Sequence, residues 1–154
     1  MKTLDSTCTG SRVHCRWMVR DNMIRVLDIE FDSFEIPWTY DDFFRELSSR
    51  NCLAMVAEIA GQVAGYVVYR LHRRYIEIIN LAVAPECRRD GVGRAMLDKL
   101  RAKLLKRRRN KLVAIVREKN VAGQMFFKAC GFEATAIERG YYAGEDAYRF
   151  EGRI

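Results

Sequence analysis

The residues whose types and spacing could hold a phosphate group lie in one short segment. The stretch APECRRDGVGRAM, residues 84–96, places two glycines and three arginines directly before a segment with helical spacing. Glycines let backbone N–H groups come close to a ligand, and the first turn of a helix carries positive potential. Gly91 and Gly93, with Arg88, Arg89 and Arg94, therefore suit a pyrophosphate. The residues alone leave open an ordinary helix start with solvated arginines.

Residues that could move a proton lie elsewhere in the chain. Glu77 is a lone carboxylate in the apolar segment YIEIINLAV, residues 75–83, and such a carboxylate could act as a general base. The alternative is a solvated Glu77 paired with Arg73 or Arg74. Tyr141 and Tyr142 could relay a proton, and packing on a sheet is the alternative role for one of them.

The elements that must position these residues follow from the hydrophobic pattern. It predicts strands over 12–19, 52–59, 63–71, 75–83, 111–116, 132–142 and 146–154. Helices are predicted from an Asp21 cap to about Phe31, over 40–49 after a Thr39 cap, over 91–107, and from an Asn120 cap to Cys130. The order β-α-α-β-β-β-α-β-α-β-β predicts an α/β fold: a single mixed, mostly antiparallel sheet with helices on both faces. Residues 12–154 are expected to form one domain, and residues 1–11 a flexible tail.

Composition narrows the class of protein. The 154 residues are 49% hydrophobic and 31% charged, which is typical of a globular domain, and no apolar run is long enough to span a membrane. The five cysteines are scattered without a C-x-x-C pair, and there are only two histidines. We therefore expect no metal, no disulfide framework and a cytoplasmic location.

The net charge of +7 favours an anionic partner: a phosphate-bearing cofactor, an acidic peptide or nucleic acid. The basic run KRRRNK, residues 106–111, follows the long helix and is read first as a solvated face. No aromatic residues are interleaved with these charges, so a nucleic acid partner is not expected.

Four separated segments resemble parts of one known family. The spacing R-x-x-G-x-G at Arg88, Gly91 and Gly93, after a strand ending in LAVAP, resembles the acetyl-CoA motif of the GNAT superfamily of N-acetyltransferases. The segment NVAGQMFFKACGF, residues 120–132, is similar to the family's next signature. RGYYAGEDAY, residues 139–148, and PWTYDDFFREL, residues 37–47, are similar to the tail and the substrate loop of the protein N-terminal branch, which includes the ribosomal-protein alanine acetyltransferases.

The resemblance implies acetyl-CoA as co-substrate and a set of residues that bind it. Backbone groups at the strand end would pair with the pantetheine arm: Leu81, Ala82 and Val83. The turn would take the pyrophosphate, mainly through N–H groups: Arg88, Arg89, Asp90, Gly91, Val92, Gly93 and Arg94. Asn120 would lie near the pantetheine, with Phe127 on the same helix. A helix cap alone is the alternative for Asn120, and both roles can hold together.

The chain departs from this branch at two catalytic positions. Where the alanine acetyltransferases have a Glu and a Tyr, this chain has Ile115 and Phe127, which cannot transfer protons. The place of Glu77 is similar to that of the general base in the histone-acetylating branch. In the N-terminal acetyltransferases, tyrosines such as Tyr141 and Tyr142 line the peptide slot.

We therefore expect an enzyme that transfers acetyl from acetyl-CoA to a primary amine by direct attack. The expected acceptor is a protein N-terminus, with a ribosomal protein as one candidate. Glu35 and Trp38 could face the acceptor from the loop FEIPWT, while an exposed loop acid is the alternative for Glu35. Three other functions remain open: a catalytically silent module that binds coenzyme A or a peptide, a small-molecule amine acetyltransferase, and a basic RNA- or ribosome-binding protein.

Overall fold

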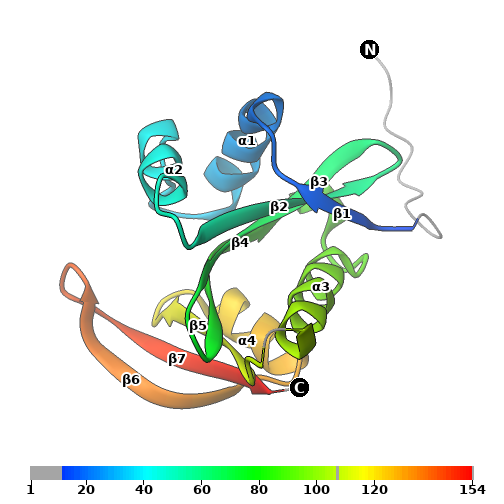
Figure 1. Ribbon diagram of the computed structural model, residues 1–154. Helices are drawn as coiled ribbons and strands as arrows, with labels where there is room; N and C mark the ends of the chain where they lie inside the picture. The colour runs from blue at the N-terminus through cyan, green and yellow to red at the C-terminus, as the bar shows by residue number, and fades with distance from the viewer. Residues whose placement is uncertain (1–11, 107, 154) are drawn as a thin grey trace. The chain divides into compact units, whose positions relative to one another are not determined.

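The computed structural model describes residues 12–106 and 108–153, and Figure 1 shows their elements. The strands are β1 His14–Trp17, β2 Cys52–Ile59, β3 Gln62–Leu71, β4 Tyr75–Val83, β5 Lys111–Arg117, β6 Glu133–Tyr142 and β7 Glu145–Arg153. The α-helices are α1 Met23–Ser33, α2 Tyr40–Leu47, α3 Val92–Lys106 and α4 Val121–Ala129, and the 3-10 helices are η1 Arg20–Asn22 and η2 Pro85–Cys87. The predicted order of strands and α-helices is confirmed. The tail expected over residues 1–11 lies outside the described residues.

The strands are hydrogen-bonded neighbours in the order β1-β2-β3-β4-β5-β7-β6. β1 pairs with β2, and β7 with both β5 and β6, in antiparallel fashion, whereas β4 pairs with β5 in parallel. The parallel register runs from Tyr75 opposite Lys111 to Ile78 opposite Ala114. The prediction of a mixed sheet is therefore confirmed.

The chain divides into two compact units. The first comprises Met1–Val68 and Asn80–Leu97, and the second comprises Tyr69–Ile79 and Asp98–Ile154. β3, β4 and α3 each contribute residues to both units. In the described residues, no helix has the length and apolar character that would let it cross a membrane.

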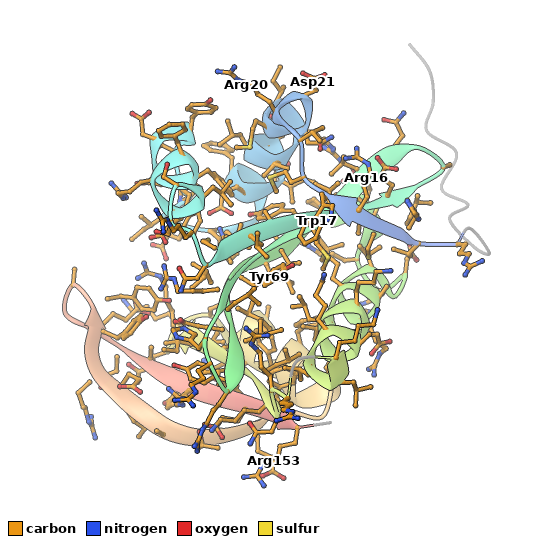
Figure 2. The ribbon with its side chains drawn as sticks, in the orientation of Figure 1. Arg16, Trp17, Arg20, Asp21, Tyr69 and Arg153 are labelled. Carbon is orange, nitrogen blue, oxygen red and sulfur yellow. The ribbon has the colours of Figure 1, made fainter. Side chains whose placement is uncertain are left out.

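In the first unit, the two helices that precede β2 begin differently. Thr39 caps α2 as predicted: its hydroxyl accepts a hydrogen bond from the Asp42 N–H at 3.3 Å, and the Asp42 carboxylate accepts from the Thr39 N–H at 2.8 Å. The prediction that Asp21 caps α1 is wrong, because Asp21 lies within η1 (Figure 2). Asn22 occupies the N-cap of α1, and its side-chain oxygen instead accepts hydrogen bonds from the Val19 N–H and from Arg16.

In the second unit, α4 packs through a cluster of aromatic rings. Phe127 is 6% exposed, and its ring lies 5.0 Å from that of Phe132 and 6.3 Å from that of Phe150. The Asn120 side chain caps α4, accepting a hydrogen bond from the Gly123 N–H at 3.0 Å. The predicted capping role of Asn120 is therefore confirmed.

Replacement of Gly65 by alanine is expected to destabilise the first unit by about 1–3 kcal/mol, the usual range for overpacking. A Cβ on Gly65 would lie 2.9 Å from the Ala82 carbonyl oxygen and 3.2 Å from side-chain atoms of Met96 and Val92. The Ala82 oxygen belongs to the backbone, so it cannot move aside as a side chain would. Thermal unfolding of Gly65→Ala would test this, and a melting temperature equal to the parent's would contradict it.

Candidate active site

The glycine-arginine turn lies in the first unit, between η2 and α3. Gly91 has a φ of 80°, and Arg89 has a φ of 69°, so two of the turn's residues are in the left-handed region. A Cβ on Gly91 would meet no atom within 4 Å, so the space beside its backbone is open. The first hydrogen bond of α3 runs from the Ala95 N–H to the Gly91 carbonyl at 2.9 Å. The N–H groups of Val92 and Gly93 come before that bond, and the first N–H groups of a helix have no acceptor within the helix, so they can bind an anion.

Arg88 connects the turn to the end of β4 and to the end of α1. Its Nε donates to the Val83 carbonyl at 3.1 Å, and its Nη2 donates to the Ser33 hydroxyl at 3.1 Å. Arg25 of α1 also forms an ion pair with Glu86 in η2. These contacts connect the segment between β4 and α3 to α1. Arg89, Asp90 and Gly91, in the same segment, are exposed. The structure gives Arg88 a structural contact that the sequence did not show, and direct cofactor contact by this residue stays a prediction.

The end of β4 leads directly into this segment. The parallel register with β5 ends at Ile78, before Leu81, Ala82 and Val83 are reached. Immediately after β4, the Ala84 N–H donates to the Ala64 carbonyl at 2.7 Å. The strand end and the turn therefore belong to the same unit and follow each other directly along the chain. A site that binds both the arm and the pyrophosphate of one cofactor requires this proximity.

The loop between α1 and α2 belongs to the same unit. Glu35 is exposed, and the adjacent Ile36 is 67% exposed. Trp38 is half-buried, and its ring packs edge-on against Phe43 with centroids 5.0 Å apart. The Trp38 N–H donates to the Glu30 carboxylate at 2.9 Å. Acceptor contact by Glu35 and Trp38 stays a prediction.

Glu77 lies in the second unit and has partners that the sequence analysis did not name. Its side chain is 15% exposed, and its Oε2 lies 2.8 Å from the His72 Nε2 and 3.7 Å from the Arg70 Nη1. The sequence suggested Arg73 or Arg74 as partners because they are closest along the chain. The His72 ring is stacked on Tyr75 with centroids 4.3 Å apart, and the Arg109 Nε donates to its carbonyl at 2.7 Å. Glu77 is therefore a half-buried carboxylate held in place by two basic side chains.

Tyr142 lies in the same unit as Glu77 and is held from two sides. The Arg117 guanidinium lies 3.8 Å from the centre of its ring, and its hydroxyl donates a long hydrogen bond of 3.4 Å to the Ile115 carbonyl. Burial raises the pKa of Tyr142, and the nearby Tyr141 and the carboxylates of Glu145 and Glu77 raise it further, against the opposing charge of Arg117. Tyr142 therefore stays protonated at neutral pH, near enough to Glu77 to feel its charge.

The two tyrosines differ in exposure. Tyr141 is 49% exposed, and its ring meets that of Tyr142 edge-on with centroids 4.8 Å apart. The side chains of Ile115 and Phe127, which also lie in this unit, carry no ionisable group. Phe127 lies within the aromatic cluster of Phe132 and Phe150. Contact of Asn120 and Phe127 with a cofactor stays a prediction. The described residues contain no group of three or more His, Cys, Asp or Glu side chains that could hold a metal ion.

The comparison with known protein families identifies the class of enzyme. Residues 23–132 match the model of the Acetyltransferase (GNAT) family, and the chain belongs to this family of acetyl-CoA-dependent enzymes. The family resemblance seen in the sequence is therefore confirmed.

Particular relatives carry narrower names. The chain is 30% identical to a Bacillus subtilis protein provisionally named ribosomal protein bS18-alanine N-acetyltransferase, over 86% of this chain and 89% of that one. It is 28% identical to an N-alpha-acetyltransferase of Sulfurisphaera tokodaii, covering 78% and 81% of the two chains. The crystal structure of the ribosomal-protein-S18-alanine N-acetyltransferase from Escherichia coli has a TM-score of 0.80 at 25% identity, covering 93% of this chain and 94% of that one.

Proposed function

We propose that this enzyme transfers the acetyl group of acetyl-CoA to the α-amine of a protein or peptide N-terminus. The observation that carries the proposal is the pairing of the open, left-handed turn at Gly91 with a preceding strand end in one unit. The relatives named as bS18-alanine and N-alpha-acetyltransferases support a protein N-terminus as the acceptor. A ribosomal protein is a candidate acceptor, and the proposed location is the cytoplasm.

In the proposed reaction, the neutral amine attacks the acetyl carbonyl carbon, so that a C–N bond forms and the C–S bond to coenzyme A breaks. Glu77 accepts the proton that the amine nitrogen loses, directly or through a water molecule. Its contacts with His72 and Arg70 fix the carboxylate in one orientation. No enzyme nucleophile is needed, and Ile115 and Phe127 take no part in proton transfer.

Tyr142 acts on the departing sulfur. A thiol has an ordinary pKa near 8.5, below that of a phenol at about 10, and the pKa of Tyr142 is raised still further. Full proton transfer from Tyr142 to the thiolate is therefore uphill, so we propose that its hydroxyl donates a hydrogen bond to the sulfur while solvent supplies the proton. The 3.4 Å bond to the Ile115 carbonyl is weak enough to be exchanged for this contact.

Tyr142→Phe is expected to lower the turnover number about 10- to 100-fold, the range for one hydrogen bond to a charged group. Because the raised pKa keeps Tyr142 protonated, the ratio of parent to variant rates should stay constant from pH 6 to about pH 9. Steady-state rates of coenzyme A release across that range would measure it. Tyr148→Phe, which removes a hydroxyl from a half-buried tyrosine of β7 in the same unit, serves as the control, and equal rates for Tyr142→Phe and the parent would contradict the role.

The acceptor can be tested with paired peptides. We expect a peptide that begins with a free alanine to be acetylated faster than the same peptide with a blocked N-terminus and a free lysine. Mass spectrometry would locate the acetyl group, and release of the coenzyme A thiol would give the rate. Equal rates would move the enzyme to lysine or general amine acetylation. Binding of acetyl-CoA without any turnover would favour a silent module, for which Ile115 and Phe127 are the structural argument.

A further inference from the structure

A buried carboxylate in the first unit is used by none of the steps above. Glu30, on α1, is 1% exposed, and it accepts hydrogen bonds from three separate segments of the chain. The Trp38 N–H donates to its Oε1 at 2.9 Å, while the Asn80 side-chain amide donates to its Oε2 at 2.8 Å. The Tyr66 hydroxyl also donates to Oε2. Glu30 therefore joins the loop between α1 and α2 to strands β3 and β4.

Aromatic contacts close a ring around these hydrogen bonds. The Trp38 ring packs edge-on against Phe43, and Phe43 packs edge-on against Tyr66 with centroids 5.7 Å apart. Tyr66 and Trp38 both return to Glu30 through their hydrogen bonds. The loop is thus held at Trp38 by its ring and by its backbone at the same time.

We propose that Glu30 is a positioning residue that fixes the acceptor loop, residues 34–38, relative to the C-terminal half of β4, at Asn80. Asn80 directly precedes Leu81, the first of the residues assigned to the pantetheine arm. The loop carries the exposed side chains of Glu35 and Ile36, which are free to meet an incoming peptide. The proposal rests on the proposed function, because it assigns these loop residues to the acceptor.

The choice of a carboxylate supports a positioning role. Burial raises the pKa of Glu30, against the lowering effect of its three hydrogen-bond donors, so the group is not placed where its charge is most stable. An apolar side chain of similar volume often stabilises a core as well as a buried polar network does. Such a side chain could not hold Trp38, Tyr66 and Asn80 together in one geometry, whereas the two oxygens of a carboxylate can.

The loop can be monitored without any measurement of activity. The chain has two tryptophans, so Trp17→Phe leaves Trp38 as the only one. Trp17 lies on β1 and is exposed (Figure 2). In this background, Glu30→Gln should make Trp38 at least about twofold more accessible to acrylamide quenching, because the amide nitrogen of Gln repels one of the three donors. Asp28→Asn, an exposed acid on the same helix, is the matched control and should leave quenching unchanged.

The same variants should separate acceptor binding from cofactor binding. For Glu30→Gln we expect the KM for the peptide to rise about 5- to 100-fold, as for the loss of one buried hydrogen bond, with acetyl-CoA affinity within about twofold of the parent's. Tyr66→Phe removes one donor and keeps the ring, so it gives a milder effect of the same kind. It also keeps the test available if Glu30→Gln does not fold.

Two results would overturn the proposal. The first is unchanged Trp38 quenching in both folded variants, because the loop is then held without Glu30. The second is increased quenching with an unchanged KM for the peptide, because the loop then moves without affecting the acceptor. If the parent enzyme acetylates no peptide at all, the proposed acceptor fails and the assignment of the loop is overturned with it. The quenching result then still decides whether Glu30 fixes the loop.

Discussion

Glu77→Gln is expected to lower the turnover number about 100- to 10,000-fold at neutral pH, the range typical of general-base catalysis. The amide keeps the size of the side chain and can still contact His72 and Arg70, so the fold and the acetyl-CoA affinity should be retained. The loss should shrink as the pH rises, because an amine that is already deprotonated needs the base less. Turnover measured from pH 6 to 10, with acetyl-CoA affinity measured in parallel, tests this.

Two further variants make the result specific. Glu133→Gln removes an exposed carboxylate at the start of β6 and should turn over like the parent. His72→Gln can still donate a hydrogen bond to Glu77, so a small effect would show that His72 only orients the carboxylate. If Glu77→Gln matches the parent at neutral pH, Glu77 is structural. The amine proton would then leave through solvent.

Gly91→Val is expected to weaken acetyl-CoA binding at least about 30-fold, roughly 2 kcal/mol. Its side chain would fill the open space beside the turn, where we place the pyrophosphate. Val is also strained at a φ of 80°, so part of any effect could arise from the backbone alone. Calorimetric titration with acetyl-CoA, on protein whose fold has been checked by circular dichroism, gives the affinity.

Gly61→Val is the matched control for that strain. Gly61, in the turn between β2 and β3, has a φ of 78°, and a Cβ there would also meet no atom within 4 Å. It therefore carries almost the same backbone penalty at a position to which no ligand is assigned. Comparable affinity losses in the two variants, or none in Gly91→Val, would remove the pyrophosphate from this turn.

The sequence predicted what is local and missed what is not. The Thr39 and Asn120 caps depend on residues three positions away, so short-range reasoning found both. Asp21 failed as a cap because a 3-10 turn intervenes, and that turn is held by Asn22 through contacts with Val19 and Arg16. Near a helix start, several polar residues compete for the same position.

The partners of the two carboxylates show the limit more clearly. Glu77 pairs with Arg70 and His72 across the end of a hairpin, where the register of the strands decides which basic side chain comes close. Glu30 could have been noticed, because it follows Val26 by four residues on the buried face of α1. Its three donors come from segments 8, 36 and 50 residues away, so no local pattern identifies them.

The left-handed backbone at Arg89 sets the demands of folding against those of ligand binding. A non-glycine residue at a φ of 69° is strained by about 1–2 kcal/mol, so glycine at this position would give a more stable protein. Glycine would also remove a positive charge from the turn proposed to hold the pyrophosphate. Under the proposed pyrophosphate role, a selection for heat resistance would favour glycine at position 89 and lower the affinity for acetyl-CoA, whereas a selection for turnover would favour arginine. This position is therefore a poor choice for engineering a more robust enzyme, although its strained backbone makes it one of the positions that a stability screen would suggest.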